Sequence, residues 1–466
     1  MLHPDRFFDP DPAVRRIARE LYLEIKNLPI ISPHGHVEAS LFSENQPFPD
    51  PAQLIIVPDH YVFRMLYSQG IALENLGVPT CDGTLYEKDS VKIWQRFCDH
   101  FYLFAGTPSG MWLKHAFEAV FGIDEPINSS TAMEIYQKLS QKLREPDFLP
   151  RNLYGKFNIE VLSTTNGARD TLDAHKALKA SGWHGKIIPC LRPDDVTNLD
   201  LKDWKRNIDK LSEISGIDIV SYPSYIMALE KQRALFKTLG AVSTDHGIDE
   251  PFTWELSPKE ADSIFQKGLH GKSSAQEAKT FTAHMMMEMA RMSIEDGLVM
   301  QIHPGCCRNH NQMIFNRFGA DKGGDIPVQT EFTHNLHALL NKYGNHPDFT
   351  LILFTLDETT YSRELAPLAG HYPAMKLGPA WWFHDSIHGM TRHRERVIET
   401  AGVYNLIGFI DDTRAYPSIP ARHDVARRVD SNYLAGLVAR HIIDREEAGR
   451  LNRALAYDLS KKAYKL

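Results

Sequence analysis

The chain has 466 residues, of which 43% are hydrophobic and 24% charged, and its formal net charge is −7. This composition is typical of soluble globular proteins and excludes a disordered chain. The negative charge argues against a nucleic-acid partner, and no run approaches the roughly 18 apolar residues of a membrane span. Five cysteines without a CxxC pair, and an N-terminus without an apolar leader, predict a cytoplasmic protein without disulfides.

The first predicted element is an amphipathic helix over residues 11–28. Asp11 is a suitable N-cap, Pro12 fits the first helical position, and apolar residues then recur at helical spacing up to Pro29.

Eight short apolar runs follow, and each stops at polar or glycine-rich residues. Continuous apolar character is typical of strands buried on both faces, as in parallel sheets. Most gaps between the runs hold a helical pattern, for example residues 170–181 and 278–297. Alternating strands and helices over eight units predict an α/β fold of the (β/α)8 barrel type, with an open doubly wound sheet as the alternative. The runs are Pro29–His34, Ile159–Thr164, Lys186–Leu191, Gly240–Thr244, Leu298–His303, Phe349–Thr355, Ala374–Gly378 and Asn405–Ile410.

The long gap after the first run predicts a mostly helical insertion. Helical patterns at Ser90–Phe104 and Thr131–Leu143 lie in it, with few strand-like runs. The expected organisation is an N-terminal helix and first strand (1–37), a helical subdomain (38–158), and the remaining barrel with C-terminal helices (159–466).

Ionisable residues at the ends of these runs indicate a metal site, because barrel enzymes place their chemistry at the C-terminal ends of the strands. His34 and His36 are two apart on a strand and therefore face the same way. Asp412, after the last run, could add an oxygen ligand and His303 a further nitrogen. This mixture predicts one divalent ion, with zinc the first choice. A core histidine is the alternative for His303.

Two arginines at the same expected mouth are candidates for holding an anion. Arg414 is two residues beyond Asp412, so both could face the mouth, with a structural ion pair at a helix start as the alternative. Arg192 ends the third run before Pro193, and a surface salt bridge is its alternative.

Other candidates have stronger structural alternatives. His60, Tyr61 and Arg64 could share one helical face in the insertion, although a buried Tyr–His hydrogen bond explains the pattern as well. Trp381 belongs to an aromatic triplet that could be a sugar platform or simply core. Three arginines look like the solvated face of a terminal helix: Arg422, Arg427 and Arg428.

Taken together, these motifs resemble the uronate (glucuronate) isomerases of the amidohydrolase superfamily over essentially the full length. The resemblance rests on the order and spacing of His34-Gly35-His36, Asp59-His60-Tyr61 with Arg64, Thr164-Thr165, Arg192-Pro193-Asp194, Asp245-His246, His303 with Arg308-Asn309, Trp381-Trp382-Phe383 with Gly389-Met390, Asp412-Thr413-Arg414 and Arg422-His423.

The resemblance implies a distorted (β/α)8 barrel with a helical insertion and an aldose–ketose isomerase. The expected reactions interconvert D-glucuronate with D-fructuronate and D-galacturonate with D-tagaturonate. Two positions depart from the pattern: Ser32 stands where many superfamily members have aspartate, and Asp357 stands where many family members have asparagine. Neither is expected to bind the metal, and Asp357 is expected to alter hydrogen bonding to the sugar.

The implied roles follow the motifs. Metal ligands would be His34, His36 and Asp412, with His303 less secure. Arg192, Arg414, Arg64, Trp381 and Asp357 would contact the substrate, and His60 and Tyr61 would line the site.

Isomerisation through an enediol needs a base over C2 and a group that stabilises the oxyanion. The hypothesis is that Asp412 is the base and that the metal, or Tyr61 with His60, polarises the carbonyl. A metal-dependent hydrolase of the same superfamily is one alternative, and a non-catalytic sugar-acid binder is another. The expected partner is a small sugar acid, and analogy with other barrels predicts a homo-oligomer.

Overall fold

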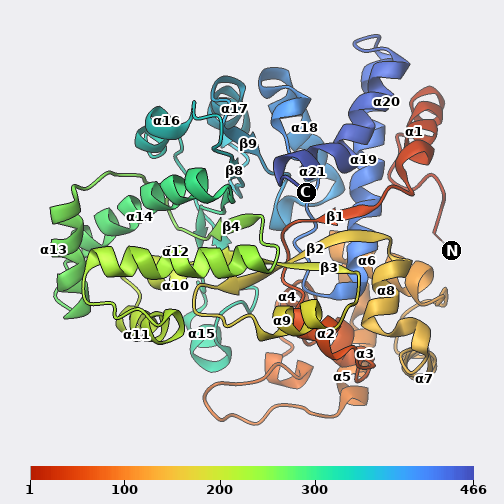
Figure 1. Cartoon of the computed structure of the whole chain (residues 1–466). Helices are drawn as coiled ribbons and strands as arrows, with labels where there is room; N and C mark the ends of the chain where they lie inside the picture. Colours follow the sequence, from red (N-terminus) through yellow and green to blue (C-terminus); the bar gives the residue numbers. More distant parts are fainter. Residues whose placement is uncertain (1) are drawn as a thin grey trace.

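A parallel sheet of seven strands lies at the centre of the computed structural model, which describes residues 2–466 (Figure 1). The strand order is β1-β2-β3-β4-β5-β8-β9, so neighbours in the sheet are consecutive in the chain apart from a separate two-stranded ribbon, β6-β7. Every neighbouring pair in the large sheet is parallel. The strands are β1 (Ile30–Ser32), β2 (Ile159–Gly167), β3 (Lys186–Arg192), β4 (Ser243–His246), β5 (Val299–Ile302), β6 (Cys306–Cys307), β7 (Ile326–Pro327), β8 (Leu351–Leu353) and β9 (Met375–Leu377).

Seven of the eight predicted strands are therefore present, and the eighth is not a regular strand. Residues 405–410 make one parallel bridge, Leu377 with Leu406, and the Ile407 amide donates to the Leu377 carbonyl. Gly408 has φ +82°, outside the range of a strand, which interrupts the ladder. Beyond Gly408, the amide of His36 donates to the carbonyl of Thr413 at 2.9 Å. The segment after β1 therefore lies beside the segment that follows residues 405–410.

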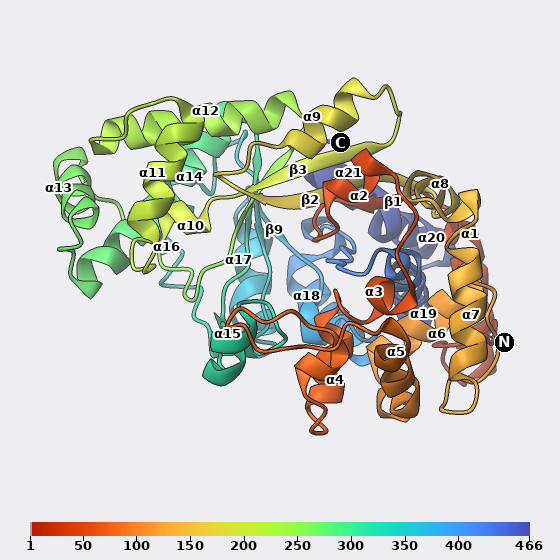
Figure 2. The ribbon, with the colours of Figure 1, turned by 90° about the horizontal axis from the view of Figure 1, so that it is seen from below.

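Helices connect the strands and cover the sheet (Figures 1 and 2). Those up to β3 are α1 (Pro12–Ile25), α2 (Ala39–Glu44), α3 (Pro51–Ile55), α4 (His60–Tyr67), α5 (Ser90–Asp99), α6 (Pro108–His115), α7 (Ala132–Lys142), α8 (Pro150–Lys156) and α9 (Asp173–Ala180). The later ones are α10 (Asp194–Thr197), α11 (Trp204–Ser215), α12 (Tyr222–Thr238), α13 (Pro258–Leu269), α14 (Ala275–Asp296), α15 (Gln312–Phe318), α16 (His337–Tyr343), α17 (Ala366–His371), α18 (Ile387–Ala401), α19 (Ile419–Ala439), α20 (Arg445–Arg453) and α21 (Leu459–Ala463).

Local sequence explains several helix ends. The Asp11 carboxylate accepts from the amides of Ala13 and Val14, as expected of an N-cap, although α1 ends at Ile25 rather than at residue 28. Helices α13 and α14 each begin with a capping box, Ser257 with Glu260 in the first. Helix α14 ends at Gly297, whose φ of +80° is the left-handed cap that glycine favours.

Between β1 and β2 the described chain is helical, from α2 to α8. The apolar faces of these helices share one buried cluster with the sheet: Phe42 and Trp94 belong to it, and so do Ile30, Ile159 and Ile187 of strands β1 to β3. The inserted helices are thus packed against the sheet through a common hydrophobic core.

Two composition-based expectations can also be compared with the structure. All five cysteines are free thiols. Among residues 2–466, no helix is both long and apolar enough to cross a lipid bilayer.

Candidate active site

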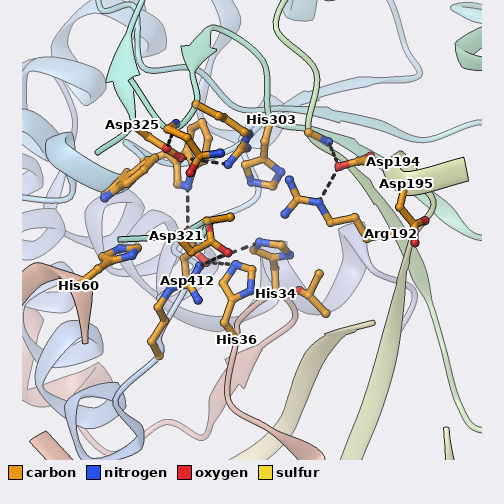
Figure 3. Close-up of a pocket in the computed structure, with 18 of the residues that line it drawn as sticks. His34, His36, His60, Arg192, Asp194, Asp195, His303, Asp321, Asp325 and Asp412 are labelled. Carbon is orange, nitrogen blue, oxygen red and sulfur yellow. Dashed lines mark hydrogen bonds and ion pairs between the residues drawn. The ribbon is translucent and has the colours of Figure 1, made fainter. Parts of the chain in front are cut away.

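A cavity of about 450 Å³ opens beyond the carboxyl ends of the strands (Figure 3). Parallel strands of this kind bring their following loops to one edge, which is why residues far apart in sequence meet here. The inserted helix α4 closes one side with His60 and Tyr61, and Arg192 lies on the opposite side. Further lining residues are His34, His36, Thr165, Asp194, His303, Arg308, Asn309, Asp321, Asp325, Trp381, Trp382, Asp412 and Arg414.

Three of the predicted metal ligands converge. Oδ1 of Asp412 lies 3.6 Å from Nε2 of His34 and 3.2 Å from Nε2 of His36. One ligand atom from each residue lies within 4.8 Å of the others. Both histidines lie just beyond β1 rather than on the strand itself, and their Nε2 atoms face the same Asp412 oxygen.

Asp412 is held in an uncommon backbone conformation. Its φ is +45°, a left-handed value that aspartate adopts more readily than most non-glycine residues. The indole Nε1 of Trp381 donates to its Oδ2 at 2.8 Å, leaving Oδ1 toward the histidines. Burial alone would raise the pKa of Asp412, but contact with His36 and His34 holds it well below its usual value.

His303 lies beside these three residues, and Asp245 and His34 fix the orientation of its ring. Its Nδ1 is 2.5 Å from Oδ1 of Asp245, and its ring stacks on His34 with centroids 4.8 Å apart. Its Nε2 is buried and has no hydrogen-bond partner in the described part of the chain. Asp245, His303 and His34 form a second group of potential ligand atoms within 4.8 Å of one another. Burial lowers the pKa of His303 to about 4.

Arg192 is half-buried at the cavity wall and pairs with two carboxylates, rather than forming a surface salt bridge. Its Nε donates to Oδ2 of Asp194 at 2.7 Å, and NH1 lies 3.3 Å from Oδ2 of Asp245. Gly247 donates its amide to the same Asp194 oxygen at 3.0 Å. A Cβ at Gly247 would collide with the guanidinium, so glycine is required for this close approach.

The insertion contributes His60 and Tyr61 from the first turn of α4, which Asp59 caps by accepting from the Tyr61 amide at 2.8 Å. Their ring centroids are 4.8 Å apart. Burial shifts the pKa of His60 well below its usual value and that of Tyr61 well above, so both side chains are neutral at pH 7.

Arg414 reaches the cavity from the same turn as Asp412. Its ion partner is Asp321 at 3.6 Å, not Asp412. Asp321 precedes Gly323 and Gly324 in the segment between α15 and β7. Burial would raise the pKa of Asp321, but Arg414 and nearby histidines lower it.

Several lining residues were not among the predicted site residues. Asp321 carries no pattern that marks it apart from the glycine pair after it, whereas Asp194 belongs to the motifs that carry the resemblance but was given no role. Arg308, which lies 3.2 Å from Asp325, belongs to the motifs that carry the resemblance but was given no role.

Two predicted substrate contacts lie outside the cavity. Arg64 packs behind the site, its guanidinium 4.8 Å from the centroid of the Phe383 ring. The Asp357 carboxylate accepts from the amides of Thr330 and Thr359, at 3.1 and 3.0 Å, and so shapes a loop.

The expectation of a solvated arginine face near the C-terminus was wrong. Arg422, Arg427 and Arg428 in α19 are 1%, 6% and 4% exposed. The helix lies between α1, α6 and α18, and acceptors from distant segments satisfy these cations.

Comparisons with known proteins agree with the geometry. The family model of glucuronate isomerase matches residues 12–464. A uronate isomerase from Nostoc punctiforme is 54% identical over 467 aligned positions, covering all of this chain and 98% of the relative.

Two solved structures have the same fold over the full chain. The crystal structure of glucuronate isomerase from Caulobacter crescentus superposes with a TM-score of 0.98 at 51% identity, covering 100% of this chain and 97% of that one. The uronate isomerase from Thermotoga maritima gives 0.93 at 29% identity, covering 100% and 99%. The chain therefore belongs to the glucuronate isomerase family and is an isomerase.

Proposed function

We propose that the cavity interconverts D-glucuronate with D-fructuronate, and D-galacturonate with D-tagaturonate, through an enediol. The single observation that supports this most strongly is the meeting of a buried carboxylate, Asp412, with two neutral proton-transfer groups, His60 and Tyr61, in one cavity. The hydrolase alternative is not favoured, because the relatives that match the full chain are isomerases.

The same carboxylate belongs to a metal site. Nε2 of His34, Nε2 of His36 and Oδ1 of Asp412 converge on one point, a set of donor atoms that suits a divalent cation. We propose that His34, His36 and Asp412 hold one zinc ion and that His303 adds a weaker fourth contact through its unpaired Nε2. When bound, the ion would supply electrostatic stabilisation of negative charge on the sugar oxygens.

Arg414 and Arg192 flank the space in which the substrate would lie. Because the net charge of −7 repels an anion, local arginines must hold the carboxylate of the uronate. We propose Arg414 as its main partner, since Asp321 at 3.6 Å is a weak and displaceable one. Arg192 is held rigidly by Asp194 and would meet hydroxyl groups, and Trp381 would pack against the sugar.

Proton transfer then uses three side chains. Asp412 takes the proton from C2 of the open-chain aldose while Tyr61 donates its phenolic proton to O1, which gives the enediol. The C2 hydroxyl loses its proton to His60 as Asp412 returns its proton to C1, and O2 becomes the ketone. Passage of the proton from His60 to the Tyr61 phenolate, its neighbour in α4, restores the site.

We also infer the larger context of the site. Residues 405–413 would close the sheet into a distorted (β/α)8 barrel, with residues 38–158 as its helical insertion. The enzyme would act in the cytoplasm as a homo-oligomer.

The test is proton NMR of each uronate in D2O with enzyme, before and after chelation. We expect the C2 proton signal to disappear as ketose signals grow, and chelation to slow both. Absence of exchange with either sugar in zinc-replete enzyme would refute the proposal.

A further inference from the structure

Arg422 joins the insertion to the turn that carries Asp412. Although it lies in the first turn of α19, its guanidinium is among the most completely buried in the molecule at 1% exposure. NH1 donates to Oδ2 of Asp385 at 3.1 Å and to the backbone carbonyl of Asp411 at 2.9 Å. Asp385 follows the short 3-10 turn Trp382–His384, so one side chain reaches two loops at the strand ends.

The faces of the same guanidinium pack against two rings of the insertion. Its carbon lies 3.8 Å from the centroid of Trp112 in α6 and 4.8 Å from that of Tyr61 in α4. Trp112 and Tyr61 also meet edge to face at 5.5 Å. The planar cation therefore limits how far the Tyr61 ring can tilt.

Arg422 also contacts the segment that leads into the left-handed residue Asp412. Asp411 precedes it, with its carbonyl bound by Arg422 and its Oδ2 lying 3.0 Å from Nε2 of His423. Arg422 and His423, adjacent residues of α19, thus hold Asp411, which precedes Asp412 and its uncommon φ of +45°. Such conformations persist where neighbouring contacts determine them.

Arg422 does not itself line the cavity, so it has no direct route to the sugar. Nor is its pairing an obvious source of stability, because buried ion pairs commonly recover little more than their desolvation cost. Burial raises the pKa of Asp385 to about 7, although the charge of Arg422 acts in the opposite direction. Burial therefore disfavours the charged form of this carboxylate.

We propose that Arg422, held by Asp385, is a positioning residue that fixes the Tyr61 phenol relative to Asp412 and thereby sets the rate of proton transfer. The inference rests on the proposed roles of Tyr61 and Asp412. A displacement of about 1 Å in a reacting group can cost about a hundredfold in rate, so a geometric link of this kind has measurable consequences.

The chain supplies a matched control away from the site. Arg394 of α18 is 2% exposed, and its Nε donates to Oδ1 of Asp430 of α19 at 2.8 Å. Neither residue lines the cavity. Arg422→Lys and Asp385→Asn should therefore be compared with Arg394→Lys and Asp430→Asn for kcat, KM, zinc content and thermal midpoint.

We expect Arg422→Lys to lower kcat ten- to a hundredfold with KM within threefold of wild type and unchanged zinc content. Lysine keeps the charge but cannot stack on both rings while donating to two acceptors. Arg394→Lys should lose comparable thermal stability and keep its kcat. Asp385→Asn, a change of nearly equal volume, should lower kcat by a smaller factor, and it serves if Arg422→Lys does not fold.

A double-mutant cycle separates positioning from general damage. In a Tyr61→Phe background, Arg422→Lys should lower kcat by less than threefold, because no phenol remains to be placed. A full ten- to hundredfold loss in that background, a loss confined to KM, or equal loss in Arg394→Lys would overturn the inference. Wild-type enzyme that turns over neither uronate would instead refute the proposed function.

Discussion

The two sides of the cavity differ in whether their polar groups are already matched. On the histidine side, formed by His34, His36, His303 and Asp412, potential metal-ligand atoms face one another, and Nε2 of His303 has no hydrogen-bond partner among residues 2–466. On the arginine side the charges are paired, Arg192 with Asp194 and Asp245, although Oδ1 of Asp194 has no hydrogen-bond partner among the described residues. Unmatched buried groups are costly alone, so the histidine side is built to receive a ligand, while the arginine side is built to stay in place.

The most severe test of the histidine side is Asp412→Asn. Asparagine keeps the shape and tolerates the left-handed φ, but it cannot take a proton and is a poorer metal ligand. We expect kcat to fall by about 10²–10⁴-fold. Steady-state kinetics with zinc analysis measures both effects, and near-normal turnover would exclude Asp412 as the base.

The position of Arg192 on the arginine side can be disturbed without removing any charged residue. Gly247→Ala places a Cβ where the Arg192 guanidinium lies, so the guanidinium must shift from its present position. We expect kcat/KM to fall about tenfold to a hundredfold with zinc retained. Gly271→Ala is a suitable control, because Gly271 has open space around it and its φ of +64° imposes backbone strain without a collision. Equal losses in both variants would mean that Arg192 placement is unimportant.

Asp321 is less firmly paired than Arg192, because its ion pair with Arg414 is long and its side chain is half exposed. Asp321→Asn should lower KM for uronates a few-fold, since the substrate carboxylate would no longer compete for Arg414. The effect should shrink as salt increases. A raised KM would show instead that Asp321 binds the sugar directly.

The smallest expected effect is on the pH dependence of stability, through His175, which lies away from both sides of the cavity. Burial lowers the pKa of His175 to about 4, below its ordinary value of 6.5, so the unfolded chain binds more protons between these values. This contribution to stability is complete above pH 6.5 and is lost as pH falls toward 4. His175→Gln should reduce the loss of unfolding free energy between pH 7 and 5 by on the order of 1 kcal/mol, seen as a smaller fall in the thermal midpoint. Unchanged pH dependence would contradict the assignment.

The sequence predicted the histidine side better than the arginine side for a physical reason. His34 and His36 come directly at the end of an apolar run, and the end of such a run is a local pattern. Asp194 is a local partner of Arg192, but Asp245 meets Arg192 only when β3 and β4 lie together, which no local pattern encodes.

The same distinction explains the two errors in the expected architecture. The apolar run 405–410 indicates a strand, but Gly408 turns the backbone out of the strand region. Arginines on a terminal helix are usually solvated, but Arg422 finds acceptors at Asp385 and Asp411. Whether a cation is buried depends on partners supplied by distant segments.

The hydrophobic cluster shared by the inserted helices and strands β1 to β3 also decides how substrate reaches the cavity. Swinging the insertion away as a unit would expose Phe42, Trp94 and the strand residues packed with them, at about 25 cal/mol for each Å² of apolar surface. The segment from Arg308 to Asp325 borders the same cavity, and Ile314 and Phe318 of its helix α15 are buried in this cluster as well. We therefore expect both the insertion and α15 to stay packed against the sheet while sugar acids enter and leave the cavity.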